Sequence, residues 1–259
     1  MNWSPEHYLE TAVIAKAAGE ELLTRLEWMA IQPKRVIDLG CGTGTISETL
    51  QQRYPNTPVL AIDIAENMLR HAKQNTVNNN TIYICADGEK IPLATNTVDI
   101  IFANFLFPWL TNQQTVLNEC QRVLRPNGLL MFTTLGPDTL KEWQNTFKGN
   151  LIPLFIDIHD IGDLLIQQGF SDPVLDVLHY TLTYKSVEKF ISELSITGMI
   201  DNPPLGLDLN NLVEEENIAV TVEVIFVHAF VSDLETGYKT SEHGLTKIPL
   251  SHLRHQLNQ

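Results

Sequence analysis

The stretch Val36-Ile37-Asp38-Leu39-Gly40-Cys41-Gly42-Thr43-Gly44 decides the fold of this chain. Its first four residues are typical of a short buried strand, and its alternating glycines predict a tight turn into a helix. Because glycine has no Cβ and tolerates positive φ, such a turn lets a ligand approach the backbone closely. A second apolar run ends at Asp63, about 20 residues on, where a carboxylate can accept hydrogen bonds from both hydroxyls of a ribose. The pattern therefore predicts a site for a ligand that contains a nucleoside.

The carboxylate inside this stretch indicates which nucleoside ligand fits. A dinucleotide site is typical of G-x-G-x-x-G, which points a helix N-terminus at a pyrophosphate. The pattern here is D-x-G-x-G-x-G from Asp38 to Gly44, and an acidic group at that point repels a pyrophosphate but suits an amino group. S-adenosylmethionine carries an amino acid end and a sulfonium, so it fits better. The alternative is that the glycines serve packing alone, and Asp63 and Asp87 weigh against it.

Composition and charge limit the classes of function. The chain has 259 residues, of which 44% are hydrophobic and 19% charged, as in globular proteins. Its formal net charge of −14 opposes binding to nucleic acid or an anionic membrane, so we expect neither partner. Cys41, Cys85 and Cys120 match neither a disulfide framework nor a zinc pattern, and we expect no metal. No signal peptide and no apolar segment long enough to span a bilayer is evident, so we expect a cytoplasmic protein.

Strand-like and helix-like segments alternate from residue 36 to residue 134. Apolar runs predict strands over Val36–Leu39, Val59–Ile62, Ile82–Ala86, Val98–Ala103 and Leu129–Thr134. Helices are expected between them over Ile46–Arg53, Ala65–Asn75 and Gln114–Leu124, with a turn at Pro126-Asn127-Gly128 after the last. Such alternation gives right-handed crossovers, so we predict an α/β fold with a mostly parallel central sheet and helices on both faces.

The two flanks of this region follow other patterns. Further helices are expected over residues 6–30, 138–147, 159–168 and 186–196. Further strands are expected over Val174–Tyr184 and Val220–Phe230. A loop is expected over 201–217, where Pro, Asn, Asp and Glu are abundant. The later segments therefore predict a small C-terminal α+β appendage.

Several motifs resemble those of known families. Residues 30–135 resemble the class I S-adenosylmethionine-dependent methyltransferases, which have a Rossmann-like fold. This likeness rests on the glycine turn and on Asp63–Leu69, Ala86-Asp87, Ile91-Pro92-Leu93, Val98-Asp99 and Val123–Gly128. A narrower likeness is to the biotin-synthesis malonyl-acyl carrier protein O-methyltransferases, over Phe132–Leu140, His159–Asp163, Gly169–Val174, Thr181–Tyr184 and Glu223–Ala229. It implies methylation of the free carboxylate of malonyl-acyl carrier protein, with S-adenosylmethionine as cofactor.

The resemblance also implies roles for individual residues. Cofactor binding is implied for Asp38, Gly40, Cys41, Gly42, Gly44, Asp63, Ile64, Met68, Asp87, Gly88 and Asn104. In this interpretation the glycines hold the methionine end, Asp38 takes its amino group, Asp63 binds the ribose and Asp87 binds the adenine amino group. Asn104 and Phe105 are implied to line the methyl-transfer centre. Glu6-His7-Tyr8 resembles the family's segment that folds over the cofactor, and we hypothesise a catalytic role for Tyr8, which closes the site; the alternative is a packing residue at a helix start.

The same resemblance divides the chain into four parts. Residues 1–30 form an N-terminal helical lid segment, and residues 31–140 form the cofactor-binding core. Residues 141–232 form the acceptor-side part. Residues 233–259 are a polar tail that we expect to be poorly ordered.

The acceptor side is where the chain departs from the family. The family carries a longer, Arg-containing insertion where this chain has Asn202–Leu207, and no arginine occurs between Arg125 and Arg254. A malonyl carboxylate favours a cationic partner. Lys185 and Lys189 are candidate substitutes for the arginine, but the favoured interpretation of each is a solvated lysine on a helix face. One alternative is therefore a paralogue with a different acceptor, such as a complex I assembly factor-like protein-arginine hydroxylase. Another is a non-catalytic S-adenosylmethionine-binding module, which the intact glycine turn disfavours.

Overall fold

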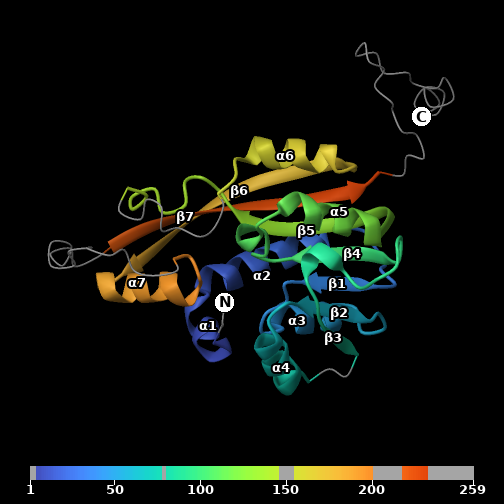
Figure 1. The fold of residues 1–259 in the computed structure, drawn as a ribbon, viewed down its shortest axis with the longest axis horizontal. Helices are drawn as coiled ribbons and strands as arrows, with labels where there is room; N and C mark the ends of the chain where they lie inside the picture. Colours follow the sequence, from blue (N-terminus) through green and yellow to red (C-terminus); the bar gives the residue numbers. More distant parts are fainter. Residues whose placement is uncertain (1–3, 78–79, 146–154, 201–217, 233–259) are drawn as a thin grey trace, which may run out of the picture.

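The strands of the protein form one sheet. The structure is a computed structural model that describes residues 4–77, 80–145, 155–200 and 218–232. Within these residues the sheet has seven strands in the order β3-β2-β1-β4-β5-β7-β6 (Figure 1). They are β1 (Val36–Leu39), β2 (Val59–Asp63), β3 (Thr81–Cys85), β4 (Val98–Ala103), β5 (Leu124–Leu135), β6 (Phe170–Tyr184) and β7 (Ile218–Val231).

The first five strands are parallel, and the last two run antiparallel to their neighbours. The helices are α1 (Pro5–Thr11), α2 (Val13–Glu27), α3 (Thr45–Arg53), α4 (Glu66–Asn75), α5 (Gln113–Val123), α6 (Ile158–Gln167) and α7 (Val187–Ile196). Two short 3₁₀ turns, η1 (Gly88–Lys90) and η2 (Phe107–Trp109), follow β3 and β4. The predicted α/β class with a mostly parallel sheet is confirmed.

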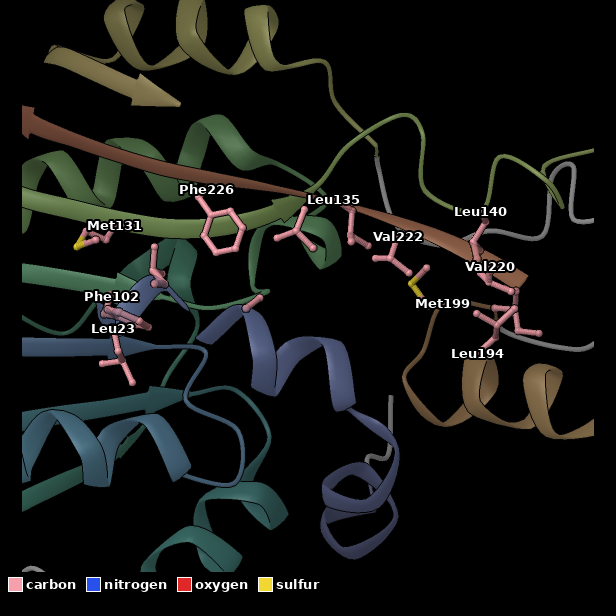
Figure 2. Close-up of a cluster of buried hydrophobic side chains, with 14 of the residues drawn as sticks. Leu23, Phe102, Met131, Leu135, Leu140, Leu194, Met199, Val220, Val222 and Phe226 are labelled. Carbon is pink, nitrogen blue, oxygen red and sulfur yellow. The ribbon is translucent and has the colours of Figure 1, made fainter. Parts of the chain in front are cut away.

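Helices cover both faces of the sheet because strand residues alternate between two apolar clusters. One cluster joins α2, α3 and α7 to residues such as Val36, Phe102 and Phe226. The other joins α5 and α6 to residues such as Ile37 and Val227. Figure 2 shows Phe226, Leu135 and Val222 on the face of β5 and β7 that looks toward α2, with Met199 and Leu194 at the far end. The first cluster therefore runs from the parallel strands to α7.

The last two strands continue past the end of β5. Leu135, the last residue of β5, pairs with Val224, whereas β7 goes on pairing with β6 as far as Ile218 and Tyr184. Residues 179–184 and 218–223 thus form a two-stranded ribbon, and α7 packs on it through Phe190, whose ring lies 5.1 Å from that of Tyr184. The expected C-terminal α+β appendage corresponds to this ribbon with α7, and it extends the main sheet (Figure 1).

The N-terminal helix expected over residues 6–30 is two helices. Ala12 leaves the helical region, with φ −76° and ψ 48°, and separates α1 from α2. The break lets α1 contact α4 and α7 while α2 lies against β5. The second helix ends at Glu27, so residues 28–30 lie outside it.

The helix expected over 138–147 is also wrong for its described part, because residues 137–145 form turns. The backbone N–H of Leu140 donates to Thr221 of β7 at 2.8 Å, and that of Asp138 donates to the Glu223 carboxylate at 2.6 Å. These bonds to β7 replace the bonds that a helix would make. Residues 146 and 147, the loop expected over 201–217 and the tail from 233 lie outside the described residues.

The turn expected at Pro126-Asn127-Gly128 lies inside the irregular start of β5. Val98 of β4 pairs with Leu124, and the register then shifts so that Ile100 pairs with Leu129. Asn127 has φ +60°, a left-handed conformation that asparagine tolerates. The three residues that predict a turn therefore form an irregularity within β5.

Candidate active site

A cleft opens at the carboxyl ends of the parallel strands, where open α/β sheets bind ligands. One cavity of about 450 Å³ lies between α2, the glycine turn and the ends of β1 and β4. A second, of about 240 Å³, lies beyond the ends of β2 and β3. Both are lined by Gly40, and we call the two cavities together the strand-end cleft. The volume of the first cavity, even without the second, lies within the range that is usual for small-molecule sites.

The glycines of the turn serve different purposes. Gly42 has φ +52°, and a Cβ built on it would meet nothing within 4 Å, so its Cα faces the open cleft. Gly44 has φ +80° and does not line the cleft, and a Cβ there would lie 2.8 Å from the Cβ of Ala72 in α4. Gly42 therefore leaves room for a ligand, whereas Gly44 lets α3 and α4 pack closely.

Asp63 ties the ends of β1 and β2 together. Its Oδ2 accepts a hydrogen bond from the backbone N–H of Gly42 at 2.8 Å, and its Oδ1 accepts one from Ala65 at 2.8 Å. Burial raises the pKa of this carboxyl, although the two backbone hydrogen bonds act in the opposite direction. The carboxylate lines the second cavity beside Ile64, which is 68% exposed. Met68 is buried on α4 and lines neither cavity.

Asp38 is a buried carboxyl in the wall of the first cavity. It is 1% exposed and accepts a hydrogen bond from the hydroxyl of Ser47 in α3. Burial raises its pKa to about 7, and the charge of Asp63 adds to the effect. Cys41 lines the same cavity, and burial raises the pKa of its thiol. Because a buried carboxylate is stabilised by a cation, this wall fits an ammonium group.

Asp87 and Gly88 line the second cavity, next to Asp63. Asp87 caps the η1 turn, since its Oδ1 accepts a hydrogen bond from the backbone N–H of Glu89 at 2.9 Å. The two aspartates at the ends of β2 and β3 therefore face the same space. Hydroxyl and amino donors are the groups that such acceptors bind.

Asn104 and Phe105 follow directly after β4. The Asn104 amide donates to the backbone oxygen of Ala15 in α2 at 2.7 Å and accepts from the hydroxyl of Thr133 at 2.8 Å. Both ends of its amide are engaged, so this residue holds α2 against the sheet while it lines the cleft. Phe105 has φ +54°, a left-handed conformation that is costly for a bulky residue and is frequent at functional sites.

An apolar pocket lies beside the cleft and is lined by Phe105. Its walls come from α1, α2, α7, β5, β6 and β7, and it measures about 80 Å³. Among the described residues that line it, Glu193 is the sole charged side chain, and Glu193 forms a hydrogen bond with the Tyr184 hydroxyl. The pocket therefore suits an uncharged group.

Tyr8 lies where the cleft and the apolar pocket meet. It lines both, as do Ala12 and Ala15. Burial and the charge of Asp63 together raise the pKa of the Tyr8 phenol to about 12, so the hydroxyl stays protonated at neutral pH. The N-terminal helices thus bring a hydrogen-bond donor to the junction.

Sequence reasoning missed several residues that line these spaces. Trp109 lines both the second cavity and the apolar pocket, and its position just after β4 was an available signal. Lys16 and Glu20 line the cleft from α2, and Glu193 lines the pocket from α7. No local motif marks these three, because the packing of distant helices brings them to the site.

Comparisons with known proteins agree with this geometry. Residues 37–132 match the family model described as a methyltransferase domain. A putative methyltransferase from Bacillus halodurans has the same fold, with a TM-score of 0.62 at 18% identity over 82% of this chain and 99% of its own. A Haemonchus contortus phosphoethanolamine N-methyltransferase 2, solved with S-adenosyl-L-methionine, has a TM-score of 0.55 at 15% identity over 83% and 53%.

Curated relatives define the family more narrowly. The malonyl-[acyl-carrier protein] O-methyltransferase of Gallionella capsiferriformans is 39% identical over 74% of this chain and 70% of its own length. The malonyl-[acyl-carrier protein] O-methyltransferase 1 of Coxiella burnetii is 33% identical over 94% and 89%. No helix within the described residues is long and apolar enough to cross a membrane. The expected class of enzyme and its cofactor, S-adenosylmethionine, are confirmed, and the chain belongs to the malonyl-[acyl-carrier protein] O-methyltransferase family.

Proposed function

We propose that this chain transfers a methyl group from S-adenosylmethionine to the free carboxylate of a malonyl group on acyl carrier protein. The observation that carries the proposal is the junction at Tyr8, where the strand-end cleft meets the apolar pocket. Such an arrangement brings a cofactor on one side and an acceptor on the other to a shared point. The names of the curated relatives indicate the same acceptor.

In this proposal the cofactor lies across both cavities of the cleft. Asp38 faces its amino group, and Gly42 leaves space for its methionine end. Asp63 accepts from the ribose hydroxyls, and Asp87 accepts from the adenine amino group. Gly40, Cys41, Gly88 and the exposed Ile64 complete the walls, whereas Gly44 and Met68 support the site from outside the cleft.

The sulfonium of the bound cofactor supplies an electrophilic methyl group. A carboxylate acceptor is already ionised at neutral pH, so the chain needs no general base. Its residues act by holding the acceptor oxygen in line with the methyl carbon and sulfur and by excluding water. Phe105 and Tyr8 lie where the acceptor would enter, and Asn104 is a positioning residue that fixes α2 behind them.

This placement of cofactor and acceptor gives a different role to each part of the chain. Residues 1–30 act as a lid over the cleft, residues 31–140 bind the cofactor, and residues 141–232 hold the acceptor. The described cysteines are all free, which suits a reducing compartment, and we place the reaction in the cytoplasm.

One observation favours a second candidate, a methyltransferase of this family with a different acceptor. Glu193 is the charged residue among the described ones that line the apolar pocket, and it repels a carboxylate. Lys185 and Lys189 are exposed and do not line the pocket. The region of Asn202–Leu207 lies outside the described residues. The second candidate is therefore a methyl transfer to an acceptor without a free carboxylate.

Intact-mass spectrometry of the carrier protein tests the proposal. Purified malonyl-acyl carrier protein is incubated with the chain and S-adenosylmethionine, and acetyl-acyl carrier protein serves as the matched control without a free carboxylate. We expect the malonyl form alone to gain the mass of one methyl ester. A chain that binds the cofactor but leaves the malonyl form unchanged would contradict the proposed acceptor.

A further inference from the structure

We propose that Asp138, His179 and Glu223 form a binding site for a divalent cation of the zinc class. The three residues come from different elements: Asp138 follows β5, His179 lies in β6 and Glu223 lies opposite His179 in β7. Each offers one ligand atom, and these atoms all lie within 4.8 Å of one another. The site lies outside the strand-end cleft, where the turn after β5 meets the ribbon, and ion binding can be tested without reference to the proposed function.

The distances within this cluster fit an ion better than direct hydrogen bonds. His179 Nε2 is 3.6 Å from Asp138 Oδ2 and 3.9 Å from Glu223 Oε1. Both separations are too long for hydrogen bonds. Ligands bound at about 2.1 Å around a tetrahedral zinc ion lie roughly 3.4 Å from one another. A small inward movement of the side chains would therefore place all three atoms on one ion.

A second set of contacts orients the carboxylate that is least exposed. Glu223 Oε2 accepts a hydrogen bond from the backbone N–H of Asp138 at 2.6 Å, which leaves Oε1 on the side of His179. The Glu223 side chain is 12% exposed, so it has little freedom to turn away. Hydrogen bonds that fix the direction of a ligand in this manner are typical of protein metal sites.

Charge also favours a cation at this point. Two carboxylates face one imidazole, and Lys141 Nζ donates to Asp138 Oδ2 at 3.2 Å, a contact that a bound ion would displace from this ligand atom. One nitrogen and two carboxylate oxygens match zinc and similar divalent ions, whereas magnesium and calcium prefer oxygen ligands alone. Asp138 and His179 are half exposed, which gives the ion access from solvent and leaves room for a water ligand.

The position of the cluster gives the ion a structural consequence. Leu140 follows Asp138 by two residues and Val222 precedes Glu223, and both line the apolar pocket. A bound ion would join the turn at residues 137–145 to β6 and β7. It would thus hold one wall of the pocket in place, and the cluster would act as a brace for the acceptor side.

Zinc titration of the full-length chain tests this site. The chain is treated with a chelator and titrated calorimetrically at about pH 8, where a free imidazole is neutral. Cobalt is used as a second probe, because its visible absorption reports nitrogen and oxygen ligands. We expect His179→Gln and Asp138→Asn each to weaken one zinc site at least tenfold and to remove the cobalt bands.

His159→Gln is the matched control, because His159 is an exposed histidine on α6 that lies outside the cluster. It should bind zinc as the unmodified chain does. Zinc should also raise the thermal unfolding midpoint of the unmodified chain and of His159→Gln, but not of His179→Gln. Equal zinc affinity and equal cobalt spectra for the unmodified chain and His179→Gln would overturn the proposal, as would no binding to either.

Discussion

The strand-end cleft and the apolar pocket are built in different ways. The glycines and carboxylates of the cleft lie at or just after the ends of parallel strands, and α1 and α2 complete the wall of its first cavity. A hydrogen bond at this edge of the sheet joins Gly42 and Asp63, 21 residues apart. The pocket is assembled from α1, α2, α7, β5, β6 and β7, so that Tyr8 and Val222, near opposite ends of the described chain, line the same space. Local motifs therefore specify the first site, whereas long-range packing specifies the second.

The two sites also differ in chemistry. The cleft holds the carboxyl groups of Asp38, which is buried, and Asp63, which is half-buried, and removal from water raises the pKa of both. The pocket is apolar apart from a few groups such as Tyr184 and Glu193. Parallel strands end together and bring polar groups to one edge, while packed helices leave an apolar space. Variants can therefore separate cofactor binding from acceptor binding.

Replacement of Gly42 should affect the cleft more than any other change. Gly42→Asn keeps a residue that tolerates positive φ but places a side chain in the open cleft. We expect cofactor affinity to fall on the order of 100-fold, or about 2.7 kcal/mol. Calorimetric titration with S-adenosylhomocysteine measures this change.

The same substitution at Gly44 is the control for that experiment. A Cβ there would meet Ala72 at 2.8 Å, so Gly44→Asn should lower the free energy of unfolding by about 1–3 kcal/mol. It should affect the binding of the cofactor less, because Gly44 does not line the cleft. Unchanged affinity in a folded Gly42→Asn variant would contradict the placement of the ligand.

Tyr8→Phe should separate catalysis from cofactor binding at the junction of the cleft and the apolar pocket. The ring remains and fills the same space, but the protonated hydroxyl is lost. We expect turnover to fall about tenfold, or about 1.4 kcal/mol in the activation barrier, with a smaller change in cofactor affinity. Steady-state kinetics and titration on the same preparation measure both quantities. An unchanged turnover would remove Tyr8 from the proposed mechanism.

Glu193→Gln should alter the pocket and leave the cleft unchanged. The amide retains an acceptor for the Tyr184 hydroxyl but removes a negative charge. We expect KM for malonyl-acyl carrier protein to fall about threefold, because the charge that repels its carboxylate is gone. The Kd of the cofactor serves as the internal control. A higher KM would indicate that the carboxylate of Glu193 assists the acceptor.

Asp38→Asn should change the pH dependence of stability of the cofactor-free chain. The folded-state pKa of Asp38 is raised to about 7, above its unfolded value, so folding favours the protonated acid. Between about pH 4 and pH 7 the cofactor-free chain therefore loses stability as pH rises, and the neutral Asn variant lacks this loss. Urea unfolding at several pH values measures the difference. Parallel curves for the two chains would show that Asp38 is ionised throughout.

The sequence predicts the cleft well because its signals are local. Glycines and carboxylates that directly follow apolar runs lie at strand ends in any parallel sheet, and Asp38, Gly42 and Asp63 all line the cleft as a result. The exceptions are Gly44 and Met68, which lie outside it. Their motif positions indicate the fold of the turn and of α4, since both residues pack rather than face a ligand.

The sequence predicts the acceptor side less well because distant contacts decide it. Residues 137–145 have helical character in the sequence, but Asp138 and Leu140 bond to β7 and form turns instead. The break at Ala12 lets α1 contact α4 and α7, which are distant from it in sequence. Glu193 reaches the pocket through packing between elements, which no periodic pattern describes.

A crystal structure with S-adenosylhomocysteine tests the central claim most directly, because it locates the ligand relative to both sites. We predict that its amino group lies at Asp38, its ribose at Asp63 and its adenine beside Asp87. Its sulfur should face Tyr8 and the apolar pocket. A ligand seated in the apolar pocket, or a ribose away from Asp63, would contradict the assignment of the strand-end cleft to the cofactor.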